Sequence, residues 1–207
     1  WKLVEFDIKK IQEKQINELE VSTSSAPESQ GYTIVRLNRL NHKPKGHAIS
    51  KIKEQLASMY RHMIGRDEIE IFIDNKKLTY EMPEIRKSGY FQDWRDGIIK
   101  KPKKYKWYKY FTFDFRGEPV AGFVALRKKG STKQDGFSLF RRNRLIINSF
   151  KPSEIFGQSN DRRQQVIFGE IHLNQMPVAF SKNDFIWNDN ERSNFISKLK
   201  NAIEFFD

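Results

Sequence analysis

The feature that most constrains the fold is a series of short strand-like segments, separated by turn residues, in the second half of the chain. The first, Tyr105 to Phe115, is followed across the turn Arg116-Gly117-Glu118 by a second, Pro119 to Arg127. Apolar and β-branched residues in Gly136 to Ile147 and in Ile167 to Leu173 predict two further strands. The pattern therefore predicts a sheet in the second half of the chain.

Two amphipathic helices are predicted as well. One runs from about Ala48 to Ile64, with Gly65 placed to end it, and the other from about Asn190 to Phe206. Asn188 and Glu191 resemble a capping box before the second helix. The apolar stripes consist of Ile49, Ile52, Leu56, Met59 and Met63 in the first helix and Phe195, Leu199, Ala202 and Phe206 in the second. Together with the strands, these helices predict an α+β protein.

The first half of the chain carries weaker strand signals. Trp1 to Ile8 and Tyr32 to Leu40 each predict a strand, and Lys9 to Leu19 fits either a short helix or a loop. Glu68 to Tyr80 predicts a hairpin. The stretch Met82 to Pro102 contains two prolines beyond its start and two glycines, so we place a domain boundary there, between residues 1–82 and 83–207.

Composition limits the function classes. The 38% of hydrophobic residues, with 17 Phe, predicts a packed core, and the absence of cysteine excludes disulfides and thiolate metal sites. The four histidines have no metal-ligand spacing, so no metal ligand is predicted. No apolar run approaches the roughly 20 residues of a membrane span. We expect an intracellular protein, cytoplasmic or, in a eukaryote, nuclear, whose net charge of +12 favours a polyanionic partner.

A lysine-rich stretch interleaved with aromatic residues is a candidate nucleic-acid site. Lysines pair with phosphates and aromatic rings stack on bases, although lysines also protect an edge strand from pairing with other chains. The candidate residues are Lys100, Lys101, Lys103, Lys104, Lys106 and Trp107, with Arg141 and Arg142.

Three motifs occur in a defined order. Asn143 to Ile146 reads Asn-Arg-Leu-Ile at the end of a predicted strand, and Lys182 to Phe185 reads Lys-Asn-Asp-Phe in a predicted loop. Upstream, Gly31 to Ile34 precedes the Ala48 helix. With these motifs the chain resembles the GHKL ATPases, the superfamily of gyrase, heat-shock chaperones, histidine kinases and MutL. The nearest likeness is to the microrchidia (MORC) type and its bacterial ATP-binding relatives.

The resemblance implies a fold and a role. Residues 1–82 would be the end of a Bergerat-type nucleotide-binding α/β sandwich, and residues 83–207 a ribosomal-protein-like transducer domain, a mixed sheet with helices on one side. Lys182 would reach the γ-phosphate of ATP, as the catalytic and cofactor-binding lysine of the transducer. Gly31 and Thr33 would line the nucleotide pocket. ATP and Mg²⁺ would be bound mainly by an upstream domain, in a homodimer that acts on DNA or on a protein client.

Two departures from the family pattern limit this reading. The catalytic Glu and the Mg²⁺-binding Asn of an early helix are not found, and Asp135-Gly136 is the nearest approach to the Asp-x-Gly-x-Gly turn. Tyr32 stands where the family usually has Thr. We therefore expect the parent protein to be an ATPase and this part, whose opening at Trp1 suggests the middle of a reading frame, to be inactive alone. The alternatives are a free-standing basic nucleic-acid-binding module and a structural interaction domain.

Overall fold

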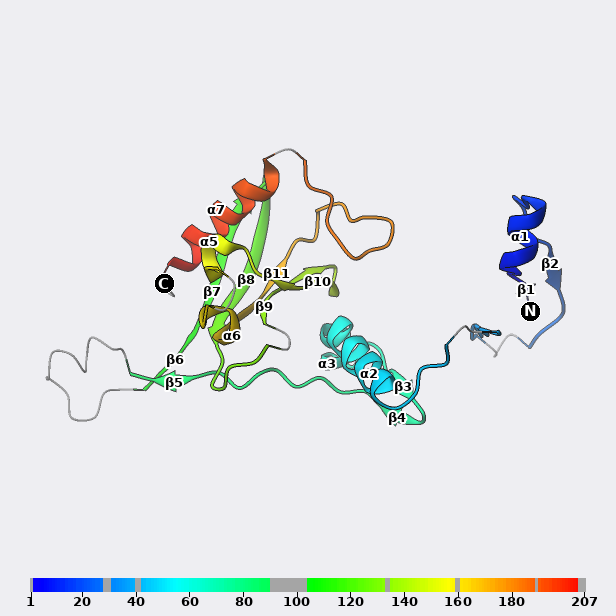
Figure 1. The fold of residues 1–207 in the computed structure, drawn as a ribbon, viewed down its shortest axis with the longest axis horizontal. Helices are drawn as coiled ribbons and strands as arrows, with labels where there is room; N and C mark the ends of the chain where they lie inside the picture. Colours follow the sequence, from blue (N-terminus) through cyan, green and yellow to red (C-terminus); the bar gives the residue numbers. More distant parts are fainter. Residues whose placement is uncertain are drawn as a thin grey trace, which may run out of the picture. The chain divides into compact units, whose positions relative to one another are not determined.

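The structure is a computed structural model that describes residues 2–27, 31–39, 42–89, 104–132, 135–158, 161–188 and 190–204. The chain divides into two units, Trp1–Lys43 and Pro44–Asp207. This division lies well before the boundary predicted at residue 82, because the predicted Ala48 helix belongs to the same unit as the sheet. Figure 1 shows the elements in sequence colours.

The first unit contains little regular structure. Strand β1 (Lys2–Val4) pairs antiparallel with β2 (Val21–Thr23), and α1 (Ile8–Lys14) begins at Asp7, whose carboxylate accepts a hydrogen bond from the Lys10 amide. None of the described residues in this unit is buried.

The strand predicted from Tyr32 to Leu40 does not form over its described residues, 32–39, which have no regular secondary structure. Its apolar side chains are exposed, among them Val35 at 79% and Leu37 at 72%. The physical reason is that an apolar strand needs a neighbouring strand and a core to cover it. The described residues of the first unit supply neither.

The second unit is built on a five-stranded mixed sheet. Its strands are β7 (Tyr108–Phe115), β8 (Glu118–Leu126), β9 (Gly136–Arg141), β10 (Arg144–Phe150) and β11 (Ile167–His172), in the order β10-β9-β11-β8-β7. Strand β11 runs parallel to β9 and antiparallel to β8, and the other neighbours are antiparallel. The predicted α+β class is thus confirmed.

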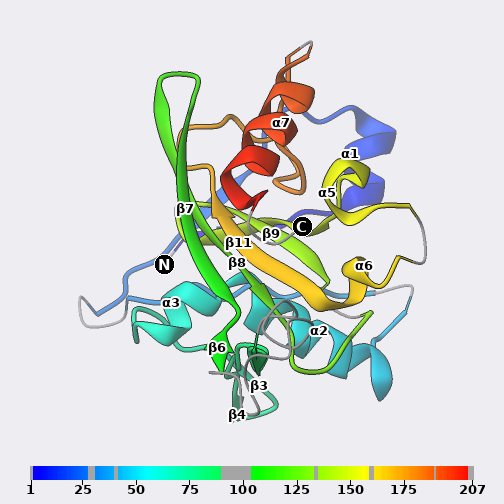
Figure 2. The ribbon, with the colours of Figure 1, turned by 90° about the vertical axis from the view of Figure 1, so that its left-hand side faces the viewer.

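Helix α7 (Glu191–Ile203) covers one face of this sheet, as Figure 2 shows. Its Phe195 and Leu199 are fully buried in the main core, where the Phe195 ring centroid lies 5.3 Å from that of Phe115 in β7. The short helices α5 (Ser153–Phe156) and α6 (Arg163–Val166) lie in the link from β10 to β11. Phe206, predicted on the same helical stripe, lies outside the described residues.

The opposite face of the sheet carries α2 (His47–Met59) and α3 (Arg61–Gly65). These two helices replace the single helix predicted from Ala48 to Ile64, because Tyr60 (φ −109°, ψ 16°) leaves the helical conformation. The predicted stop at Gly65 is confirmed. The break matters for the site, since it starts a new helix at Arg61, whose side chain reaches the sheet.

One predicted strand is in fact a hairpin. Gly136 to Ile147 was expected to be continuous, but Arg142 (φ 48°) and Asn143 (φ 65°) form a turn between β9 and β10. Positive φ at both central residues is the requirement of a type I′ turn, and Asn tolerates it better than most residues. Asn143 of the Asn-Arg-Leu-Ile motif therefore lies in a turn, and only Arg144 to Ile146 lie in a strand.

Short hairpins and bridges complete the unit. Strands β3 (Phe72–Ile73) and β4 (Lys76–Lys77) flank the predicted Asp74-Asn75 turn, and β5 (Lys87–Ser88) pairs with β6 (Tyr105–Lys106). Among the residues that the structure describes, no helix combines the length and the apolar character needed to cross a lipid bilayer.

Candidate functional site

Lys182 lies in a short loop that closes on itself between β11 and α7. Val178 and Phe185 form an antiparallel bridge at the base of the loop, and the Ile186 amide donates to the Pro177 carbonyl at 2.9 Å. Within the loop, the Ala179 amide donates to the Asp184 carbonyl at 2.9 Å. These hydrogen bonds give the loop a fixed shape even though it has no regular secondary structure.

The loop is anchored by Phe185, the last residue of the Lys-Asn-Asp-Phe motif. Its side chain is 3% exposed and belongs to the main core, where its ring lies 6.1 Å from that of Trp187. By contrast, Phe180 on the other side of the loop is fully exposed. The loop thus has a buried side at Phe185 and a solvent-exposed side at Phe180.

Lys182 itself is exposed and adopts a left-handed backbone conformation, with φ 54°. Its amide donates to the Ala179 carbonyl at 2.8 Å. A non-glycine residue in this region costs of the order of 1–2 kcal/mol, which the surrounding hydrogen bonds must offset. No carboxylate among the described residues pairs with its ammonium group. The loop therefore presents an unpaired positive charge to solvent.

A shallow pocket of about 280 Å³ adjoins the next two residues of the motif. Asn183 and Asp184 line it together with Ser149, Lys151 and Arg192, among others. The Lys151 ammonium is already paired with Asp135 at 2.8 Å, and the Ser149 hydroxyl donates to the same carboxylate at 2.6 Å. Asp135, whose Asp-Gly pair is the nearest approach to the Asp-x-Gly-x-Gly turn, is therefore buried in a local ion pair.

A second polar cluster is buried between α3 and the sheet. The Arg61 guanidinium (5% exposed) donates through Nε to Glu170 Oε1 at 2.7 Å, and through Nη1 to the Ser58 hydroxyl at 3.0 Å. The same guanidinium lies over the rings of Phe140 and Tyr80, with its central carbon 4.4 Å and 4.9 Å from their centroids. This cluster fixes α3 to the central strand β11.

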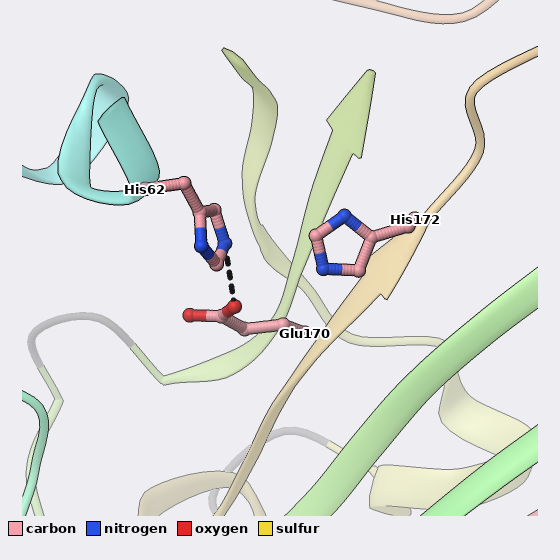
Figure 3. Close-up of side chains that lie close together, drawn as sticks. All are labelled: His62, Glu170 and His172. Atoms are coloured by element: carbon pink, nitrogen blue, oxygen red, sulfur yellow. Dashed lines mark ion pairs between the residues drawn. The ribbon is translucent and has the colours of Figure 1, made fainter. Parts of the chain in front are cut away.

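His62 and His172 adjoin the same carboxylate, as Figure 3 shows. His62 Nε2 lies 2.8 Å from Glu170 Oε2. The His172 ring stacks on Phe140, and its centroid is 5.2 Å from that of His62. One ligand atom from each of His62, Glu170 and His172 lies within 4.8 Å of the others.

The pKa shifts follow from this arrangement. Burial alone would raise the pKa of Glu170, but the contacts with His62 and Arg61 outweigh it and hold the pKa below its usual value. For His172, burial lowers the pKa, and the neighbouring His62 and Arg61 lower it further. Glu170 is therefore ionised near neutral pH, whereas His172 is neutral.

Gly31 and Thr33, expected to line a nucleotide pocket, lie in the exposed stretch of the first unit that has no regular structure. An added Cβ at Gly31 would meet no atom within 4 Å.

The basic residues predicted to bind nucleic acid are only partly described, since Lys100, Lys101 and Lys103 lie outside the described residues. Lys104 and Lys106 are exposed, and the Lys106 ammonium lies 5.1 Å from the centroid of the Tyr108 ring. The indole of Trp107 is half-buried and donates to the Ser88 hydroxyl at 2.7 Å.

Arg141 and Arg142 lie elsewhere on the sheet. Register across the strands places Tyr108 level with Ala125, Phe168 and Gly136, at the start of β9, whereas Arg141 ends that strand. Five residues along a strand span about 16 Å. The sheet therefore does not bring these arginines beside Lys106.

The cluster of Arg61, His62, Glu170 and His172 was not predicted from the sequence, because more than a hundred residues separate its two halves. One signal was present: Glu170 and His172 alternate with apolar residues in a strand, so both side chains leave the same face. No protein-family model matches this chain, and no curated protein matches its sequence.

Proposed function

We propose that this chain is the transducer portion of a GHKL-type ATPase, in which Lys182 senses the γ-phosphate of ATP and couples nucleotide binding and hydrolysis to a conformational change. The finer fold in this proposal is the end of a Bergerat-type sandwich followed by a ribosomal-protein-like transducer domain. The observation that carries the proposal is the Lys182 loop. It holds an unpaired, exposed lysine on a closed turn whose far end, Phe185, is in the core.

The loop has the properties that a phosphate sensor requires. An ammonium is a compact charge that binds phosphate oxygens, and a charge-assisted hydrogen bond contributes about 1.5–3 kcal/mol. A ligand shifts a conformational equilibrium only by its different affinity for the two states. A lysine that meets the γ-phosphate only when the domains close would supply such a difference, because ADP lacks the group it binds.

The first unit supports the existence of a further domain. Ile34, Val35 and Leu37 are each more than 60% exposed, and they lie within four residues of one another in a segment without regular secondary structure. Exposed apolar segments of this kind mark surfaces that another partner covers. In the proposal, the partner is the rest of the nucleotide-binding domain, which would also supply the catalytic Glu, the Mg²⁺ ligand and most of the ATP site.

The buried contact between Arg61 and Glu170 offers a route for coupling. It joins α3, in the region assigned to the nucleotide-binding domain, to the central strand of the sheet, and the loop of Lys182 follows that strand directly. In the proposal, a displacement of the loop is transmitted through β11 to α3. The net charge of +12 supports DNA as the client, with a protein client as the alternative.

The test is steady-state ATP turnover by the full-length protein, with ATP binding measured in parallel. We expect Lys182→Ala to reduce turnover at least tenfold without unfolding the protein, because the charge that stabilises the transferred phosphoryl group is lost. Lys129→Ala is the matched control, since Lys129 is also an exposed loop lysine and should leave turnover unchanged. Equal turnover by wild type and Lys182→Ala would refute the sensor role. Absence of ATP binding by the wild type would refute the ATPase and favour the nucleic-acid-binding module.

A further inference from the structure

The cluster formed by His62, Glu170 and His172 has the composition of a metal site, and it is separate from the Lys182 loop. Glu170 and His172 are two residues apart on β11, so they project from the same face of the sheet, and His62 approaches them from α3. In Figure 3 the two imidazoles and the carboxylate face a common space. All three candidate ligand atoms lie within 4.8 Å of one another.

We propose that His62, Glu170 and His172 bind one divalent transition-metal ion, with Zn²⁺ as the preferred ion. Two imidazole nitrogens and one carboxylate oxygen form a three-ligand set that suits Zn²⁺ and leaves a fourth position for water or another ligand. Tetrahedral Zn²⁺ with bonds of about 2.0–2.1 Å places its ligand atoms roughly 3.4 Å apart. His62 Nε2 and Glu170 Oε2, at 2.8 Å, are already near that spacing. The ring nitrogen of His172 lies within 4.8 Å of the other two ligand atoms, and rotation of its side chain must shorten that distance.

Two neighbouring contacts favour this arrangement. Arg61 donates to Glu170 Oε1, which fixes the carboxylate and leaves Oε2 turned toward His62, as outer-shell groups do in metal sites. In addition, His62 Nε2 already lies 2.8 Å from Glu170 Oε2. A ring nitrogen and a carboxylate oxygen held this close can coordinate one metal ion in place of the proton between them.

The positive charge of Arg61 lowers the affinity of the cluster for a metal ion. A guanidinium in contact with the ligating carboxylate repels a dication, so we expect micromolar rather than nanomolar affinity. His62 is only partly covered, with 23% of its side chain exposed, so an ion can enter from solvent without unfolding α3.

The experiment is calorimetric titration of Zn²⁺ into the chelator-treated chain, with matched double variants. His62→Gln/His172→Gln removes both imidazoles of the cluster, and His42→Gln/His47→Gln removes the other two histidines of the protein, which are exposed. We expect one equivalent of Zn²⁺ to bind the wild type and the control variant with micromolar affinity. The cluster variant should bind at least tenfold more weakly. No binding by the wild type, or equal binding by the cluster variant, would overturn the proposal.

A second measurement covers the case in which the cluster variant does not fold. The ring nitrogens of ¹⁵N-labelled histidine in the wild-type chain are observed by NMR, with assignments from the exposed-histidine variants His42→Gln and His47→Gln. Zn²⁺ should shift the ring signals of His62 and His172 and leave those of His42 and His47 in place. Shifts confined to His42 and His47, or equal shifts at all four residues, would show surface binding and contradict the assignment.

Discussion

At the residue scale, the contact between Arg61 and Glu170 dominates the local energetics. Both side chains are nearly inaccessible to solvent, and Phe140 and Tyr80 cover the guanidinium. Removal of solvent from two charges has a large cost, which a short and well-directed contact offsets. Loss of Arg61 leaves the buried Glu170 carboxylate without its well-directed guanidinium partner. The contact is therefore a point at which α3 can be released from the sheet.

The first prediction compares a buried ion pair with an exposed one. Arg61→Met should lower the free energy of unfolding by roughly 3–5 kcal/mol, because Glu170 remains buried without its main partner. Lys128→Met, which breaks the exposed contact with Glu84, should change it by only about 0–1 kcal/mol. Urea denaturation in the presence of a metal chelator measures both. A loss of less than 1 kcal/mol in Arg61→Met would show that this contact does not hold α3 to the sheet.

At the element scale, strand β7 is the edge of the sheet that presents the basic and aromatic surface. Tyr110 is 76% exposed, and its ring packs edge-on against Tyr108, which in turn lies beneath the Lys106 ammonium. This arrangement provides both a charge for phosphates and a ring for bases. The same charges also protect the edge strand from pairing with other chains.

The second prediction tests nucleic-acid binding at this edge and separates the contribution of charge from that of stacking. If the edge binds single-stranded nucleic acid, Lys106→Ala should reduce the slope of log affinity against log salt by roughly one unit, because one phosphate contact is lost. Tyr110→Ala should weaken binding by about 1–3 kcal/mol and leave the slope unchanged, because stacking releases no counterions.

Fluorescence anisotropy across a salt series measures both effects. Lys51→Ala is the control, since Lys51 lies on α2, which contacts the opposite edge of the sheet at β10. If Lys106→Ala and Lys51→Ala change the slope equally, the binding reflects total charge and not a site formed by Lys106 and β7.

Local sequence signals predicted most helices and strands of the second unit, but they did not predict where some of these elements are interrupted. The β7–β8 pair, β11 and α7 were predicted because their apolar periodicity and turn residues lie within one segment. The break at Tyr60 and the turn at Arg142-Asn143 were missed, since both interrupt a favourable apolar pattern at residues that also occur in regular elements. Lys182 was singled out from its motif. The His62, Glu170 and His172 cluster was not, because it depends on a tertiary contact between distant segments.

At the scale of the whole molecule, the two units differ in how many of their apolar side chains they bury. The sheet unit has a continuous core of aromatic and aliphatic side chains from Phe111 to Ile203. The described residues of Trp1–Lys43 bury none of their apolar side chains. In the proposed account, the first unit is completed by an upstream nucleotide-binding domain, and the sheet unit reads that domain's ligand through Lys182.

The central claim is that Lys182 distinguishes a nucleotide with a γ-phosphate from one without. The most direct measurement is the ratio of the dissociation constants of ADP and a non-hydrolysable ATP analogue for the full-length protein with Mg²⁺. The account predicts a ratio well above one for the wild type and for Lys129→Ala. It predicts a ratio at least tenfold smaller for Lys182→Ala, which corresponds to about 1.4 kcal/mol of lost γ-phosphate binding. An unchanged ratio in Lys182→Ala would contradict the account.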